Sequence, residues 1–561
     1  MLRRAAMRET SRWGERTWLA AIVAGGVALR AYRLSWGLPD FAYPDGVMYF
    51  VRPGVQLVAA GEWVPGHFVH PPLLVYVTAL VFAVWSLVTR RAIAAAGAPF
   101  YAELPTLTLL GRATSVVFSG GAIVAVYLVG RRLLGGRGAL LAAAVFAFAP
   151  LQVLEAHRIQ PDAPMLLTIL LATLLAIVAR ERRRRALLVA AFAVAGISGG
   201  FKYTGPAVAA IPAWVALTWP DEWRQRIRWT ALGGLVMLAG LALGCLPVFF
   251  DWHKAWSTAW AVIYYSYVIG MSGVDIKADG WTYVRYVYAL VVALPYMVGW
   301  AAYLAALAGF AVLVRRRPAS AGIVLAFVVP YFAIMGGATA IVARYYLPLA
   351  PYLALAAGAA LDEAVAWRRG IGLAVVAVVL AYTAGVSVSQ CRRLGLGPQR
   401  EVAALVADRA RDARPPERAV AVAYPHVLEL YYDAVGPLVR TIPRVKMVYY
   451  PAPYQNVRHE SVAVPPEDES LALERGWVRD QDVQVVLLPS WEEHAVLREH
   501  PHGANARFFA HLRDGVLGFH EAAEFHTRFW TQALYTWGDP MLDTHWETAI
   551  TGYKVFVREQ G

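Results

Sequence analysis

Charged residues are scarce in this chain. Only 16% of its 561 residues are Asp, Glu, Lys or Arg, whereas 58% are hydrophobic. A soluble protein of this length carries roughly a quarter charged residues, so the composition excludes an ordinary soluble fold. It predicts a mainly α, multi-pass protein of the cell membrane.

Cysteine is scarce too, and a cleavable leader is not apparent. Cys245 lies in an apolar run and Cys391 at the edge of the last one, so we expect no disulfide between them. The first apolar run follows Arg3, Arg4, Arg8, Arg12 and Arg16 and lacks a small-residue cleavage site. We expect this run to remain as an anchor whose N-terminus is cytoplasmic.

Positive charge gathers in short arginine clusters. The formal net charge is +13, but the sequence shows no basic groove with interleaved aromatic residues, which argues against a nucleic-acid partner. Arginine clusters between apolar runs are typical of loops that face the cytoplasm. The clusters are Arg131-Arg132 with Arg137, Arg182 to Arg185, Arg224 to Arg228, Arg315 to Arg317, and Arg368-Arg369.

With these clusters held inside, the apolar runs predict helices that alternate in direction. They span residues 17–34, 112–130, 138–157, 164–180, 186–202, 204–219, 230–250, 285–313, 320–340, 344–361 and 371–389. Residues 72–111 must then cross twice or not at all. Because 72–88 is apolar and Arg90-Arg91 mark an inner end, we expect two further crossings, one of them in the weaker segment 92–111, and about thirteen helices.

The composition changes near residue 390, where charge, proline and histidine become more frequent. Residues 1–389 are predicted to form the membrane domain, with 35–71 as its first outer loop. Residues 390–561 are predicted to form a soluble, extracytoplasmic α/β domain. Its expected strands are 419–423, 483–488 and 553–557, with helices near 399–411 and 503–514.

The first outer loop carries Asp40, Asp45, His67 and His70 within a short distance along the chain. Such a set could supply a general base with phosphate-binding partners, or a metal site. Alternatively, the loop is solvated and its two aspartates only cap short helices. Asp45, in Tyr43-Pro44-Asp45-Gly46, is the first candidate for chemistry because it follows the first apolar helix.

A second acidic site lies at an outer turn, Glu155-Ala156-His157-Arg158-Ile159-Gln160-Pro161-Asp162. The prolines nearby make Asp162 a plausible helix cap, which is the structural alternative to a catalytic role. This turn faces the same compartment as Asp45 in the predicted topology. We therefore keep Asp162 as a catalytic candidate and His157 as a neighbouring one.

Two cations lie at the outer boundary of apolar helices. Lys202 ends one helix and Arg344 begins another, each beside tyrosine, and Arg112 is a weaker third. A single Lys or Arg side chain at this depth could simply extend so that its charged end reaches the membrane interface. Two cations beside aromatic rings suit the phosphate of a lipid carrier.

Together these segments resemble the GT-C integral-membrane glycosyltransferases, specifically the dolichyl-phosphate-mannose protein mannosyltransferase superfamily, which includes the bacterial aminoarabinose lipid A transferases. The resemblance runs through Pro44-Asp45, Pro71-Pro72-Leu73, Gly111-Arg112, Asp162, Lys202-Tyr203-Thr204-Gly205 and Arg344-Tyr345-Tyr346-Leu347-Pro348. One departure is Gly46, where this superfamily usually has Glu after the Asp. A second carboxylate would then come from Asp162 or Asp40, or be unnecessary.

The resemblance implies transfer of a sugar from a polyprenyl-phosphate donor to an acceptor hydroxyl on the non-cytoplasmic face, with inversion. Asp45 would be the general base, and the acceptor a protein, a lipid or a polysaccharide. Asp40, His67, His70 and His157 would support the acceptor or the catalytic groups. Phosphate is a fair leaving group when cations stabilise it, so a metal is not required, although a divalent ion stays open. The last domain would help to choose the acceptor.

The competing interpretation is a polytopic transporter or flippase for a lipid-linked or small anionic substrate. Such a protein would also bury charges among many helices. The sequence shows no inverted repeat and no pair of broken helices in matching halves, which favours the transferase.

Overall fold

The computed structural model divides into two units, which we call the helical unit and the sheet unit. The helical unit comprises Met1–Ser35, Asp45–Ile269 and Val284–Cys391, and the sheet unit comprises Trp36–Pro44, Gly270–Tyr283 and Arg392–Gly561. The structure describes residues 2–39, 46–264, 285–338, 343–394, 399–410, 418–422, 445–449, 466–489, 502, 504–526 and 552–558.

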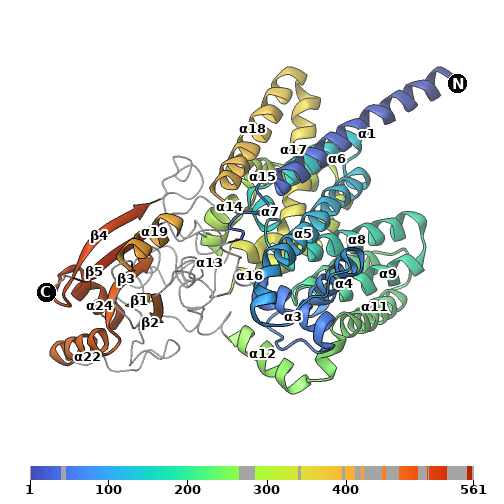
Figure 1. Cartoon of the computed structure of the whole chain (residues 1–561). Helices are drawn as coiled ribbons and strands as arrows, with labels where there is room; N and C mark the ends of the chain where they lie inside the picture. The colour runs from blue at the N-terminus through green and yellow to red at the C-terminus, as the bar shows by residue number, and fades with distance from the viewer. Residues whose placement is uncertain are drawn as a thin grey trace. The chain divides into compact units, whose positions relative to one another are not determined.

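Helices make up nearly all of the described helical unit (Figure 1). In chain order they are α1 (Leu2–Ala31), η1 (Val47–Val51), α3 (Arg52–Val55), η2 (Gln56–Ala60), α4 (Leu73–Thr89), α5 (Gly97–Leu133), α6 (Gly136–Ala147), α7 (Pro150–Glu155), α8 (Asp162–Arg182), α9 (Arg185–Ser198), η3 (Gly205–Ala209), α10 (Ala210–Leu217), α11 (Trp223–Gly244), η4 (Leu246–Phe249), α12 (Trp252–Tyr264), α13 (Arg285–Tyr288), η7 (Ala289–Ala293), α14 (Leu294–Val298), α15 (Trp300–Arg316), α16 (Pro318–Met335), η8 (Ala343–Leu349), α17 (Ala350–Trp367) and α18 (Arg369–Arg393).

Among the described residues, fewer helices are long and apolar enough to cross a membrane than the predicted thirteen. Among the described residues, 6 helices are long and apolar enough to cross a membrane, or up to 7 if a bent pair counts as one span. Several predicted crossings are short: α6 has 12 residues and α9 has 14. A helix needs about 20 residues to cross the hydrocarbon layer, so α6 and α9 are too short to cross it on their own.

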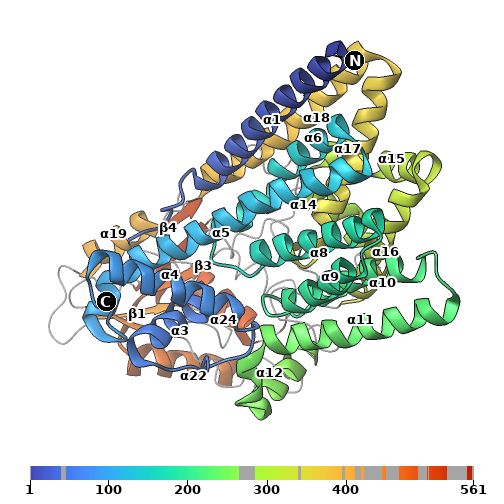
Figure 2. The same ribbon diagram turned by 90° about the vertical axis from the view of Figure 1, so that its right-hand side faces the viewer.

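The separate crossing predicted for residues 92–111 is wrong, whereas the predicted apolar segment 72–88 does form a helix of its own, α4. Residues 97–133 form one continuous helix, α5, of 37 residues, with Pro105 inside it. This helix is about 55 Å long, nearly twice the hydrocarbon thickness of about 30 Å. If Arg131 and Arg132 mark its inner end, its first part extends beyond the outer side, and α4 then has no reason to cross. Figure 2 shows α3 and α4 beside that first part of α5, far from the N-terminus of α1.

Two other predicted helices are interrupted. The segment 285–313 bends by 115° between Val298 and Trp300. Gly299 has φ 84° there, a conformation that residues with a Cβ rarely adopt. The segment 138–157 breaks before Pro150, which lacks the amide hydrogen needed to continue α6.

Facing glycines let α9 and α11 pack closely. A Cβ on Gly196 would lie 2.0 Å from the Met237 carbonyl oxygen, and one on Gly240 would lie 2.4 Å from the Ala193 carbonyl oxygen. The absence of a side chain at Gly196 and Gly240 allows this backbone approach, as small residues do in many membrane helix pairs. The predicted crossings 186–202 and 230–250 are thus packed against one another.

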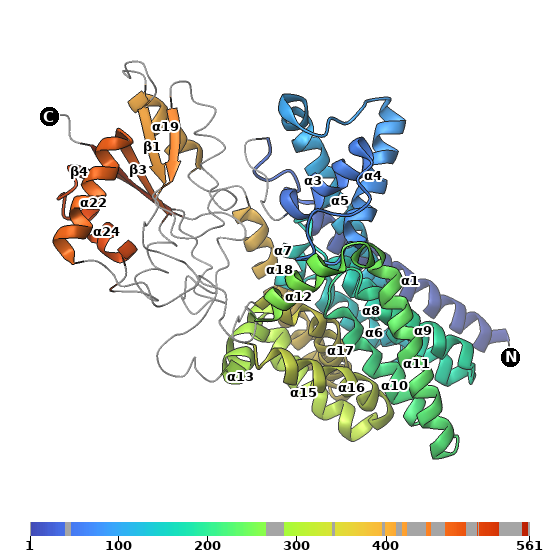
Figure 3. The same cartoon turned by 90° about the horizontal axis from the view of Figure 1, so that it is seen from below.

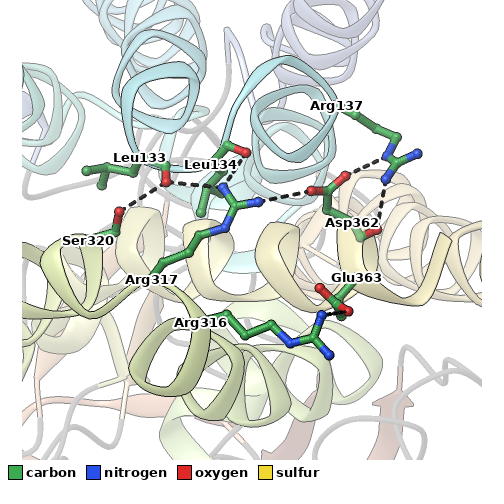
Figure 4. A network of polar contacts seen from close by, with 8 residues as sticks. All are labelled: Leu133, Leu134, Arg137, Arg316, Arg317, Ser320, Asp362 and Glu363. Carbon is green, nitrogen blue, oxygen red and sulfur yellow. Dashed lines mark hydrogen bonds and ion pairs between the residues drawn. The ribbon is translucent and has the colours of Figure 1, made fainter. Parts of the chain in front are cut away.

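Two arginine clusters meet at the ends of neighbouring helices (Figure 4). The Asp362 carboxylate accepts from Arg137 at 2.5 Å and contacts the Arg317 guanidinium at 3.5 Å, and Arg316 pairs with Glu363. Ser320 donates to the Leu133 carbonyl at 3.0 Å. These contacts join the ends of α5, α6, α15, α16 and α17. Two of the clusters that the positive-inside rule assigns to the cytoplasm are therefore neighbours in space.

The sheet unit contains a mixed sheet with the order β2-β1-β3-β5-β4 (Figure 3). Its strands are β1 (Arg418–Val422), β2 (Val445–Tyr449), β3 (Val483–Pro489), β4 (Phe519–His526) and β5 (Gly552–Arg558), and its helices are α19 (Gln399–Ala410), α22 (Glu467–Asp480) and α24 (Ala504–Arg513). The predicted strands near 419–423, 483–488 and 553–557 and the predicted helices near 399–411 and 503–514 are confirmed. β1 is parallel to β2 and β3, whereas β5 is antiparallel to β3 and β4.

The core of the sheet unit contains one buried polar group. α22 and α24 pack on the sheet through Val478, Phe508 and Leu512, against Val486 and Phe556. Within this core, Glu474 accepts from Ser470 at 3.2 Å and lies 2.7 Å from Nδ1 of His511. Burial raises the pKa of Glu474, and its contact with His511 opposes that rise. The paired side chains tie α22 to α24.

Single-cysteine labelling tests the corrected position of α4. Glu62→Cys, Arg91→Cys and Asp480→Cys place thiols at exposed positions, and Arg183→Cys places one beside an arginine cluster. We expect the first three to react with an impermeant thiol reagent on intact spheroplasts and Arg183→Cys to stay unlabelled. The unmodified chain is the blank because Cys245 and Cys391 are buried. Protection of Arg91→Cys alone would restore a crossing by α4.

Candidate active site

A buried ion pair connects the start of α8 with the segment after α9. The Lys202 ammonium lies 2.6 Å from Oδ1 of Asp162, and the two side chains are 13% and 2% exposed. Asp162 is the first residue of α8, where the positive end of the helix dipole also favours its carboxylate. The structure therefore brings together two predicted site residues that are 40 positions apart in the chain.

Aromatic rings and a second cation border the ion pair. The Lys202 ammonium lies 5.5 Å from the ring centroid of Tyr345, a favourable cation–π distance. Tyr345 follows Arg344 in η8, and its carbonyl accepts a hydrogen bond from Tyr331 at 2.8 Å. Lys202 and Arg344 thus approach the same part of the helical unit from two separate segments.

His70 lies within electrostatic reach of both cations. Its ring stacks on Phe50 at 5.4 Å and meets the edge of Tyr49 at 5.2 Å. Burial lowers the pKa of His70 well below its ordinary value, and the positive charges of Arg344 and Lys202 lower it further. His70 is therefore neutral at physiological pH, and it adds a hydrogen-bonding group to the cation pair without adding charge.

His67 belongs to the same aromatic group. Its ring meets that of Tyr49 at 4.7 Å. Burial lowers the pKa of His67 to about 4, and the Lys254 charge on α12 contributes a smaller lowering. Tyr203 donates to the Phe68 carbonyl at 2.9 Å, and the amide of Leu73 donates to the Gly200 carbonyl at 2.9 Å. These bonds tie the first outer loop to the Lys202 segment.

The outer turn 155–162 lies against the segment that follows the candidate base. A Cβ on Gly46 would be 3.5 Å from Ile159, and one on Gly111 would be only 2.5 Å from it. Gly111 therefore has to lack a side chain for Ile159 to pack there. Asp45 and Asp40 themselves lie outside the described residues.

Arg112 and His157 occupy buried positions beside this turn. Arg112 is fully buried and donates to the Leu34 carbonyl at 2.8 Å, which links α5 to the end of α1. His157 has Nδ1 2.8 Å from the Val153 carbonyl oxygen and Nε2 2.9 Å from that of Tyr32. These hydrogen bonds to backbone carbonyls indicate that Arg112 and His157 help to position the turn.

The turn also contains polar groups that the sequence did not single out. Arg158 is fully buried and pairs with Glu155 at 3.0 Å. Gln160 is buried, at 1% exposure. The only sequence signal for either was its place in the segment between His157 and Asp162. Among the described residues, no group of three or more His, Cys, Asp or Glu side chains is placed to hold a metal ion.

Comparison with known proteins identifies the fold and a family that part of the chain resembles. Residues 107–248 match the sequence model of the dolichyl-phosphate-mannose-protein mannosyltransferase family. That segment includes Arg112, Asp162 and Lys202. No curated protein sequence matches the chain.

Two solved structures share the fold. ArnT from Cupriavidus metallidurans, bound to undecaprenyl phosphate, is 17% identical with a TM-score of 0.50, and the match covers 86% of this chain and 95% of ArnT. The archaeal oligosaccharyltransferase AglB from Archaeoglobus fulgidus, in complex with an inhibitory peptide and a dolichol-phosphate, is 12% identical with a TM-score of 0.54, over 98% of this chain and 89% of AglB. Residues 107–248 thus resemble the dolichyl-phosphate-mannose-protein mannosyltransferase family, and the chain shares its fold with ArnT and AglB.

Proposed function

We propose that the chain transfers a sugar from a polyprenyl-phosphate donor to an acceptor hydroxyl on the non-cytoplasmic side of the membrane, with inversion at the anomeric carbon. The observation that carries the proposal is the grouping of Lys202, Arg344 and His70 beside Asp162. Two cations and a neutral imidazole form a suitable site for one phosphate group. ArnT, which shares the fold, is described with undecaprenyl phosphate bound.

The charge distribution along α8 supports this location. Asp162 begins α8, and the arginine cluster at Arg182 ends it, so the helix has 21 residues. That length is about 30 Å, the thickness of the hydrocarbon layer. If the arginine cluster is cytoplasmic, the phosphate-binding group lies at the opposite surface, where the lipid-linked donor would be held.

The chemistry needs a base on one side of the sugar and stabilised phosphate on the other. Lys202 and Arg344 would neutralise the charge that develops on the departing phosphate, so a separate acid is not needed. Asp45 would take the proton of the attacking hydroxyl. The described neighbour of Asp45, Gly46, lies against Ile159 in the same turn that carries Asp162. A single displacement with base and leaving group on opposite faces inverts the anomeric carbon.

Substitution of the cations tests donor binding. Lys202→Ala and Arg344→Ala should each weaken binding of decaprenyl phosphate by about 10- to 100-fold, because each loses a charge-assisted hydrogen bond. Arg91→Ala removes an exposed cation outside the group and should bind normally. Titration of purified variants in detergent measures the affinities. Normal binding by both substituted variants would mean that the two cations only extend to the membrane interface.

Substitution of the proposed base tests the mechanism. Asp45→Asn keeps the size of the side chain but cannot accept a proton, so transfer should fall by about 10²–10⁴-fold while donor binding persists. Asp40→Asn should reduce transfer only mildly, and Asp162→Asn should reduce it by an intermediate amount. Turnover from polyprenyl-phosphate sugars is compared at equal folded concentration. Near-normal turnover in Asp45→Asn would mean that another residue is the base, and full activity in all three variants would mean that none of these carboxylates takes the proton.

A double substitution separates the structural role of the Asp162–Lys202 pair from its role in binding. Lys202→Met leaves a buried carboxylate unpaired and should lower stability by about 3 kcal/mol, because breaking one half of a buried pair is costly. Adding Asp162→Asn should restore most of that stability, measured by thermal unfolding in detergent. The double variant should still bind decaprenyl phosphate poorly. Recovery of binding together with stability would reduce the pair to a structural contact.

A further inference from the structure

One polar side chain of the outer turn stands apart from its neighbours. Gln160 is 1% exposed, and neither the nitrogen nor the oxygen of its carboxamide has a hydrogen-bond partner among the described residues. Burying an amide without a partner is unfavourable. In the same turn, Glu155 is paired with Arg158, and Asp162 is paired with Lys202.

The position of Gln160 connects the two halves of the proposed site. Its predecessor, Ile159, packs against Gly46, the residue after the candidate base. Two positions later, Asp162 holds Lys202, which belongs to the cation group. A group between a base and a leaving phosphate is where the transferred sugar has to be bound.

The chemistry of a carboxamide matches sugar hydroxyls better than phosphate. A carboxamide offers donors and an acceptor side by side, and neighbouring hydroxyls of a sugar ring offer the same. A phosphate group only accepts hydrogen bonds, and lysine and arginine supply the charged donors that it needs. The buried charges near the turn favour a neutral sugar as well: Glu155 is paired with Arg158 and Asp162 with Lys202, and the positive charges of Arg30 and Arg112 lie near His157. An amino sugar would bring a further positive charge among them.

We propose that Gln160 determines sugar specificity by binding ring hydroxyls of the donor, and that the preferred donor carries a neutral, hydroxylated sugar and not an amino sugar. This inference rests on the proposed function, because it assigns the sugar of the same lipid-linked donor. Gln160 acts on the sugar alone, whereas Lys202 and Arg344 act on the phosphate.

The experiment compares Gln160→Met with the unmodified chain. The probes are bare decaprenyl phosphate, decaprenyl phosphate linked to mannose, glucose, galactose or arabinose, and decaprenyl phosphate linked to aminoarabinose. We expect Gln160→Met to bind bare decaprenyl phosphate within about twofold of normal and to lose about 10- to 100-fold of its affinity for the best neutral donor. Its thermal stability should not fall, because the substitution removes an unpaired buried amide. Gln152→Met, the same change at another buried glutamine of this region, should leave both affinities unchanged.

Three results would overturn the inference. Gln160→Met with lower thermal stability and an unchanged preference for sugar-bearing donors would make Gln160 a structural residue. A preference of the unmodified chain for the aminoarabinose donor over all neutral donors would contradict the charge argument. Failure of the unmodified chain to bind bare decaprenyl phosphate would overturn the proposed function, and this inference with it. The first two results leave the proposed function intact.

Discussion

The contact between Asp162 and Lys202 organises the functional end of the helical unit. Both side chains are buried, and their charged atoms lie 2.6 Å apart. Neither charge would be stable there alone, so the pair holds the start of α8 and the segment after α9 in one arrangement. Lys202 is then held beside the Tyr345 ring. The neutral His70, which belongs to the first outer loop, lies near Lys202 and Arg344. The proposed phosphate site follows from this one contact.

The opposite end of the unit uses charge differently. Asp362 contacts Arg137 and Arg317 there, and their side chains are at least partly exposed to solvent. Exposed ion pairs of this kind stabilise weakly, but several of them together join the helix ends. The charged side chains are thus exposed to solvent at the arginine-rich end and buried at the end that carries the candidate site. Dry cations bind a phosphate more strongly than solvated ones do.

The sequence anticipates the residues of the site better than it anticipates the helices. Asp162, Lys202 and Arg344 were predicted to lie on one side because alternating helices bring their ends together, and the ion pair bears this out for the first two. Helix breaks were missed at Gly299 because hydropathy does not register a backbone with positive φ. The continuity of α5 was missed because Pro105 and the polar residues near it resemble a break. Asp40 and Asp45 stay predictions, because they lie outside the described residues.

The most direct test of the central claim is a structure determined by electron cryomicroscopy with decaprenyl phosphate bound in a lipid nanodisc. The account predicts the phosphate within hydrogen-bonding distance of the Lys202 ammonium and the Arg344 guanidinium, with the His70 ring beside it. A phosphate bound at the arginine-rich end near Asp362, or held by none of these three side chains, would contradict the account.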